Sequence, residues 1–174
     1  MTETTTPDAV TAALLGIRAR RIGIDGIDGC GKTTLAKIVA AGLHSRLFSL
    51  DDYLERDKGG FLDFIDYQRL HADVSAEEAY VIEGVCLLHA VQRAKLAIDT
   101  LVYVKRRHLG LWADERELDL DEPLEDFLQN ERELTAMVAC EPVTDLGLAE
   151  EVIRYHYTAR PHDNAHIVYF RDEH

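Results

Sequence analysis

Short apolar runs alternate along this chain with longer segments whose apolar residues recur every three or four positions. The runs are short enough for strands, whereas the longer segments have the period of helices that pack one face on a core. The strand-like runs are residues Arg21–Asp25, 45–54, 79–85, 99–106 and 166–170. Strands separated by helical segments are typical of an α/β domain, in which helices cover both faces of a parallel sheet. We therefore expect a single domain over residues 1–174, with a five-stranded parallel sheet flanked by helices.

The run Arg21–Asp25, with the sequence RIGID, has too little alternation to be half exposed. This pattern predicts a buried central strand. Residues 1–6 are polar and predict a disordered lead, and residues 55–60 predict a polar connection with a glycine break. The predicted helices are residues 7–18, 33–43, part of 61–74, 86–97, two pieces of the charged segment after residue 106 that separate near Pro123, and 147–161.

The composition of the chain excludes several kinds of protein and of binding partner. The chain has 174 residues, 47% of them apolar, and a formal net charge of −13, which argues against nucleic-acid binding because that function needs a basic surface. The three cysteines include no CxxC pair, the N-terminus lacks the features of a signal peptide, and no apolar run approaches the length that spans a membrane. We expect a cytoplasmic protein, monomeric or homodimeric, without nucleic-acid or membrane partners.

The sequence GIDGCGKTT begins directly after the first predicted strand and matches the phosphate-binding pattern Gly-x-x-x-x-Gly-Lys-Ser/Thr. Gly26 and Gly31 allow backbone N–H groups to approach an anionic oxygen, and the helix that follows directs its positive dipole end to the same place. Lys32 adds a mobile charge near the β- and γ-phosphates, and the Thr33 hydroxyl can take one position on Mg²⁺. The alternative is a glycine-rich turn with an incidental lysine. The remaining loop positions expected to contact the nucleotide are Asp28, Gly29, Cys30 and Thr34.

Acidic residues follow the second and third predicted strands. Asp51 and Asp52 come after one strand, and Glu83 ends the next. Ligands of parallel sheets bind beyond the carboxyl ends of the strands, so we expect these carboxylates to meet the phosphate loop. The alternative for the paired aspartates is a solvated cap or turn, and for Glu83 it is the first turn of a helix.

Five blocks of sequence resemble, in order, the uridine kinase and nicotinamide riboside kinase group of P-loop kinases: GIDGCGKTTLAK, SLDDYL, DKGGFLDFIDYQRL, YVIEGVCLL and VYVKRR. The resemblance implies a P-loop NTPase fold, use of ATP with Mg²⁺, and transfer of the γ-phosphoryl group to a hydroxyl of a small molecule. It places Asp51 at the acceptor hydroxyl and the metal, and Glu83 either at the metal and its waters or at the acceptor side. It also places Asp66 where the group contacts a sugar hydroxyl pair, with the surface of a helix as the alternative. Asp52 and Tyr53 are further candidates to contact the acceptor, with a solvated turn and core packing as the alternatives.

The same resemblance implies a lid over residues of about 106–135, whose arginines meet the phosphates. Arg106 and Arg107 are the candidates, with Arg107 in the catalytic set, although charge runs are more commonly solvated faces. Arg116 is a weaker candidate. Between Leu70 and Tyr80 the chain is shorter than in nucleoside kinases, so a smaller hydroxyl compound is as plausible an acceptor as a nucleoside or riboside.

An ATP-binding protein with a regulatory role or with no catalytic role is the alternative function. The guanine-specific Asn-Lys-x-Asp motif is absent, which argues against a regulatory GTPase. Cys30 lies beside a helix N-terminus and Lys32, surroundings that lower the pKa of a thiol. We therefore expect Cys30 to be alkylated readily and to be protected by Mg-ATP.

Overall fold

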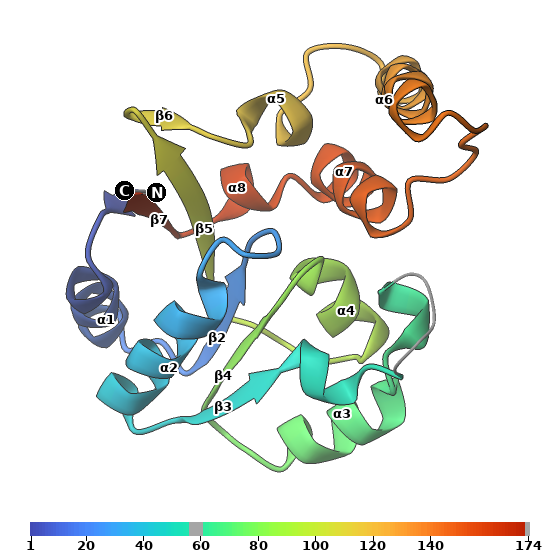
Figure 1. Cartoon of the computed structure of the whole chain (residues 1–174). Helices are drawn as coiled ribbons and strands as arrows, with labels where there is room; N and C mark the ends of the chain where they lie inside the picture. The colour runs from blue at the N-terminus through green and yellow to red at the C-terminus, as the bar shows by residue number, and fades with distance from the viewer. Residues whose placement is uncertain (56–60, 173–174) are drawn as a thin grey trace.

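The computed structural model describes residues 1–55 and 61–172, so most of the expected polar connection over residues 55–60 lies outside the described residues. A sheet of parallel strands forms the centre of the domain, with the phosphate loop at the carboxyl end of its central strand β2 (Figure 1). Along the sheet the strands are β1 (Thr2–Thr4), β7 (Ile167–Asp172), β5 (Thr100–His108), β2 (Arg21–Asp25), β4 (Tyr80–Gly84) and β3 (Arg46–Ser49). A short strand β6 (Leu111–Trp112) pairs with β5 in the antiparallel sense.

Helices cover both faces of this sheet. The helices are α1 (Pro7–Gly16), α2 (Lys32–Leu43), α3 (Tyr67–Ser75), α4 (Leu87–Arg93), α5 (Glu115–Leu118), α6 (Leu124–Ala139), α7 (Leu148–Ala159) and α8 (Pro161–Asn164). Two short 3₁₀ helices, η1 (Leu50–Tyr53) and η2 (Leu62–Phe64), follow β3. The helices α1 and α2 lie on one face, and α3 and α4 lie on the other (Figure 1). The predicted three-layer α/β architecture is thus confirmed.

Two apolar cores hold the layers together. One packs α1 and α2 against the sheet through residues such as Val10, Leu35 and Val102. The other packs the opposite helices against the sheet through residues such as Leu70 and Leu87. Because every side chain of β2 after Arg21 is buried, the strand is covered on both faces, as its sequence predicts.

The sheet is larger than expected. Among the described residues it has seven strands rather than five, because β1 and β6 extend the predicted set. The prediction of a disordered lead over residues 1–6 is wrong, since Thr2 pairs with Ile167 and β1 adds a parallel strand to β7. Backbone pairing with the outer edge of β7 orders this segment although its side chains are polar.

Two other element boundaries differ from those predicted. The run 45–54 is a strand only as far as Ser49, after which the chain turns into η1 and carries Asp51 and Asp52 on that turn. The fourth predicted strand does not end at Arg106 but continues to His108, and the chain then turns back into β6. Arg106 and Arg107 therefore lie within a β-hairpin rather than in a helical lid, and the helical part of that segment begins at Glu115.

The helix α6 starts directly after Pro123, as the predicted break requires. Within the described ranges, no helix has both the length and the apolar character needed to cross a membrane.

Candidate active site

The phosphate loop joins β2 to α2 and depends on glycine at several positions. Gly26, Gly29 and Gly31 have φ angles of 155°, 70° and 93°, in the left-handed range that side chains disfavour. A Cβ atom on Gly26 would lie 2.7 Å from the Cys30 Sγ and 3.0 Å from the Val104 carbonyl oxygen. The loop ends at the N-terminus of the twelve-residue helix α2, so its N–H groups and the helix dipole both favour an anion.

The first residues of α2 provide a cation and a hydroxyl at this loop. The Lys32 ammonium donates to the Ile27 carbonyl oxygen at 3.2 Å and stays within the loop, because the side chain is only 4% exposed. The Thr33 hydroxyl donates to Oε1 of Glu83 at 3.2 Å, which joins the loop to the end of β4. The structure therefore brings together Lys32, Thr33 and Glu83, three of the residues that the sequence predicts for phosphate and metal binding.

Glu83 is almost completely buried and only partly satisfied. Its Oε1 accepts hydrogen bonds from the hydroxyls of Thr33 and Ser49, whereas its buried Oε2 has no hydrogen-bond partner among the described residues. Burial raises the pKa of Glu83, and the nearby charge of Asp51 raises it further while that of Lys32 lowers it. The charges of Asp51 and Lys32 thus both act on this carboxylate.

The donors at this point fit Mg²⁺. The cation prefers oxygen ligands and usually keeps several waters, binding through one or two protein groups plus phosphate oxygens. Thr33 and the unsatisfied Oε2 of Glu83 provide such a set. No group of three or more histidine, cysteine or acidic side chains that could hold a metal occurs in the described part of the chain.

The predicted acceptor residues are distributed over three different environments. Asp51 and Asp52 are exposed on η1, at the carboxyl end of β3. Tyr53 is buried, with its hydroxyl donating to Asp73 at 3.0 Å, so it packs in the core in this structure. Asp66 caps α3 by accepting the Arg69 N–H at 3.0 Å. Of these residues, Asp51 contributes to the electrostatic environment of Glu83.

The two arginines expected at the phosphates are held in ion pairs. The guanidinium of Arg106 pairs with the buried carboxylate of Asp114, and that of Arg107 pairs with Asp172 at 2.6 Å. The second pair is fixed by the sheet, because Arg107 and Asp172 are directly opposite each other on β5 and β7. The weaker candidate Arg116 pairs with Glu131 on α6 at 3.1 Å.

The expectation of a reactive Cys30 is wrong. Its side chain is fully buried beneath the loop, and burial raises the pKa of the thiol to about 11. The positive charge of Lys32 acts in the opposite direction but is the smaller effect. The position beside a helix N-terminus is as the sequence indicates, yet the tertiary fold buries the sulfur there.

Asp25 is a residue of this site that was not predicted from the sequence, although it is an acid at the buried end of β2. Asp25 is 0% exposed, and its Oδ1 accepts the Gly26 N–H at 2.7 Å. Its Oδ2 accepts a hydrogen bond from the hydroxyl of Tyr155 on α7. Burial raises the pKa of Asp25 to about 7. The only signal in the sequence is the acid itself within RIGID.

Arg171 is a second residue at the loop that sequence reasoning missed. Its guanidinium donates to the Gly29 carbonyl oxygen at 2.9 Å and lies over Gly31. Arg171 comes from β7, in register with Arg106 on β5. No local pattern could reveal this approach, because 142 positions separate Arg171 from Gly29.

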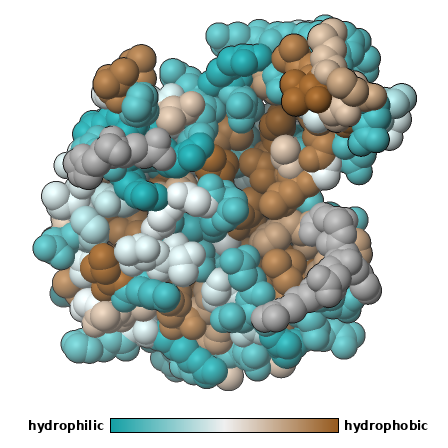
Figure 2. Space-filling model, in the orientation of Figure 1, coloured by the Kyte–Doolittle hydropathy of each residue, from teal (hydrophilic) through white to brown (hydrophobic). Residues whose placement is uncertain are grey.

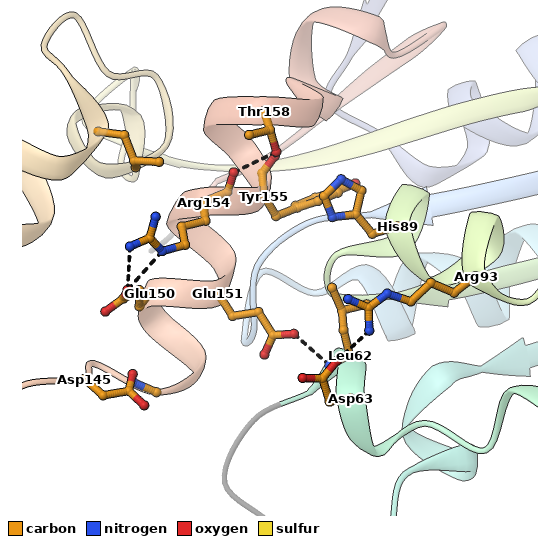
Figure 3. Close-up of a pocket in the computed structure, with 12 residues that line it drawn as sticks. Leu62, Asp63, His89, Arg93, Asp145, Glu150, Glu151, Arg154, Tyr155 and Thr158 are labelled. Carbon is orange, nitrogen blue, oxygen red and sulfur yellow. Dashed lines mark hydrogen bonds and ion pairs between the residues drawn. The ribbon is translucent and has the colours of Figure 1, made fainter.

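A cavity of about 470 Å³ lies between α7, α4 and η2 (Figure 3). Its lining includes the ring of Tyr155, which connects it to Asp25 and the phosphate loop. The other lining residues are Leu62, Asp63, His89, Arg93, Leu124, Asp145, Gly147, Glu150, Glu151, Arg154 and Thr158. Figure 2 shows a hollow on this side of the molecule, with hydrophobic residues along its floor below the α6 and α7 region.

The charged groups of this cavity are largely paired with one another. Asp63 accepts from Arg93 at 2.7 Å, and Glu150 accepts from Arg154 at 2.9 Å. Glu151 accepts the backbone N–H groups of residues 61 and 62, so α7 holds η2 in place. The cavity thus has an aromatic wall and charged side chains of both signs.

Comparisons with known proteins include a solved structure of similar outline. No family model matches the sequence, and no curated protein matches it. The chain is similar to the crystal structure of shikimate kinase from Aquifex aeolicus vf5, with 16% sequence identity and a TM-score of 0.36, over 83% of this chain and 98% of that one. Because both values are low, this likeness assigns no activity to the chain, and the resemblance to the uridine kinase group stays a prediction.

Proposed function

We propose that this protein is an ATP-dependent kinase that phosphorylates a hydroxyl group of a small molecule. The observation that carries the proposal is the hydrogen bond between Thr33 and Glu83. This bond joins the end of the phosphate loop to a buried carboxylate that has one unsatisfied oxygen. The charges of Lys32 and Asp51 both act on that carboxylate. Phosphoryl transfer depends on positioning and charge neutralisation, which these groups can provide.

The donor side of the site would hold the triphosphate and its metal. The loop N–H groups and the Lys32 ammonium would bind the phosphate oxygens, and Thr33 and Glu83 would hold Mg²⁺ with its waters. When bound, ATP supplies the phosphoryl group that the acceptor hydroxyl receives. Arg106 and Arg107 would have to exchange their carboxylate partners, Asp114 and Asp172, for phosphate oxygens if they take part.

The acceptor side would combine Asp51 with the cavity beside Tyr155. Asp51 is exposed on a turn next to Glu83, so its carboxylate would accept the proton of the attacking hydroxyl. The acceptor class we propose is a nucleoside, a riboside or a smaller metabolite with a free hydroxyl. A volume of about 470 Å³ is within the range of small-molecule pockets.

A test of this function measures ADP release from Mg-ATP with a panel of nucleosides, ribosides and sugars. We expect one class of acceptor to stimulate ADP release, and D51N to reduce that stimulated rate roughly 100-fold or more. The matched control is D8N, an exposed aspartate in the first turn of α1, which should retain the wild-type rate. Full turnover by D51N would contradict the role given to Asp51.

The alternative function is ATP binding without catalysis. Measurable ATP affinity, with no phosphorylated product from any acceptor in a broad panel, would favour it. The absence of ATP affinity in the wild-type protein would contradict both proposals.

A further inference from the structure

One tyrosine reaches from the charged cavity to the start of the phosphate loop. The ring of Tyr155 lines the cavity, as Figure 3 shows. Its hydroxyl donates to Oδ2 of Asp25 and accepts the Leu88 N–H at 3.2 Å. The hydroxyl thus donates one hydrogen bond to β2 and accepts one from α4.

Asp25 transmits this contact to the loop. Its Oδ1 accepts the N–H of Gly26, the first loop residue, at 2.7 Å, while its Oδ2 accepts from Tyr155. The carboxylate is 0% exposed, so water cannot replace either donor. A buried acceptor that loses its donor costs more than the hydrogen bond itself contributes. The tyrosine therefore helps to set the orientation of the carboxylate, and with it the Gly26 N–H, together with the backbone N–H of Leu87.

We propose that Tyr155 is a positioning residue that couples the wall of the acceptor cavity to the nucleotide loop through Asp25. The proposal rests on the proposed function, in which the loop binds the nucleotide and the cavity binds the acceptor of the same reaction. In it, Tyr155 holds Asp25 in the orientation that fixes the first turn of the loop. Removal of its hydroxyl would weaken nucleotide binding although Tyr155 is not part of the loop.

The groups that face Asp25 come from every neighbouring element. Burial, the largest effect, favours the neutral form of Asp25. The hydrogen bonds from Tyr155 and from the backbone of Gly26 and Leu87, and the charge of Lys32 on α2, favour its ionised form. The other titratable neighbours are Cys30 in the loop, Cys86 before α4 and Tyr103 on β5, whose pKa values are all raised, mainly by burial and in part by the charge of Asp25. Of these neighbours, Lys32 carries the positive charge.

The test compares two buried tyrosines, each of which loses only its hydroxyl. Y155F removes the donor to Asp25, whereas Y103F removes the buried hydrogen bond to Nε2 of His156, which does not contact the loop. We expect Mg-ATP affinity, measured by titration calorimetry, to fall about tenfold in Y155F and less than twofold in Y103F. Melting temperatures of both variants show whether the effect follows stability alone. Equal affinities of Y155F and Y103F would overturn the proposal.

K32A distinguishes this proposal from the proposed function. If K32A and wild type bind Mg-ATP equally, the loop is not the nucleotide site, and both proposals fail. If K32A loses binding while Y155F behaves as Y103F does, only the coupling fails.

A second variant serves if Y155F does not fold. Nucleotide phosphates bound at the loop would favour the protonated form of Asp25, so binding should be tighter at lower pH. We expect the ratio of Mg-ATP affinity at pH 6 to that at pH 8 to be at least about threefold larger in wild type than in D25N. D25N keeps the shape of the side chain and removes its titration. Because its amide NH₂ replaces one acceptor oxygen, the comparison uses only the ratio of affinities at the two pH values within each protein. Identical pH ratios in wild type and D25N would show that Asp25 is not linked to the nucleotide and would overturn the proposal.

Discussion

Ser49 and Glu83 face each other across neighbouring parallel strands, and the Ser49 hydroxyl donates to Oε1 of Glu83 at 2.7 Å. Thr33 donates to the same oxygen, which leaves Oε2 without a hydrogen-bond partner among the described residues. Two hydroxyls from two elements thus orient one carboxylate. The free oxygen is the feature that a bound cation would satisfy.

Replacement of this carboxylate should separate metal binding from phosphate binding. E83Q keeps the shape of the side chain but removes a negative charge beside the phosphates, so we expect ATP affinity without Mg²⁺ to be unchanged or higher and the gain on adding Mg²⁺ to fall about tenfold or more. Calorimetry with and without EDTA measures both quantities. E77Q, on the exposed ion pair with Arg46, is the control and should behave as wild type. An undiminished Mg²⁺ effect in E83Q would place the metal elsewhere.

The three cysteines should differ strongly in reactivity. Burial raises the pKa of Cys30 to about 11 and also raises that of Cys86, whereas Cys140 is exposed at the end of α6. We expect iodoacetamide at pH 7.5 to label Cys140 first, with the other two labelled at least about tenfold more slowly, because the reactive form is the exposed thiolate. Peptide mass spectrometry of the labelled protein measures each rate. Fast labelling of Cys30 in the C140S variant would contradict the buried position of its sulfur.

Two glycines should respond in opposite ways to the same substitution. A Cβ on Gly26 would contact Cys30 Sγ and the Val104 carbonyl at 3.0 Å or less, on a backbone with φ of 155°, whereas a Cβ on Gly16 would meet nothing within 4 Å. We expect G26A to lower the free energy of unfolding by about 2 kcal/mol or more and to abolish nucleotide binding. G16A, in the last turn of α1, should leave stability unchanged or raise it by up to about 1 kcal/mol. Urea denaturation measures both, and equal stabilities would refute the tight contact at Gly26.

His156 should make the fold sensitive to acid. It accepts from the Tyr103 hydroxyl through Nε2 and donates from Nδ1 to the Val152 carbonyl, an arrangement that requires the neutral ring. Burial lowers its pKa to about 4, below the ordinary value of 6.5. The unfolded chain therefore takes up a proton that the folded chain does not, between those two pKa values.

The resulting stability is present above pH 6.5 and is lost as the pH falls towards 4, by at most about 3 kcal/mol. Urea denaturation of wild type and H156Q at pH 7 and pH 5 tests this. We expect the loss on acidification to be smaller in H156Q than in wild type. The exposed His108 provides the control, since H108Q should lose as much stability as wild type. Equal losses in H156Q and wild type would contradict a neutral buried His156.

The local parts of this protein could be predicted from neighbouring residues in the chain. Gly26, Gly31, Lys32 and Thr33 are close neighbours in the chain, so the loop geometry and the helix that follows depend on interactions within a few residues. The apolar run Arg21–Asp25 likewise predicts a central strand, because only a strand covered on both faces needs so few polar side chains. Placement of Glu83 beside the loop follows from the rule that parallel strands end at one edge.

Tertiary structure alone decided the contacts between distant segments. Asp25 and Tyr155 are 130 positions apart, and their hydrogen bond depends on how α7 packs against the sheet. The burial of Cys30 reverses the shift that its neighbours in sequence predict, because desolvation outweighs the charge of Lys32. Pairing of Arg107 with Asp172, and of the polar strand Thr2–Thr4 with β7, follows from sheet register. Register and burial are properties of the whole packed sheet, and no short stretch of residues encodes them.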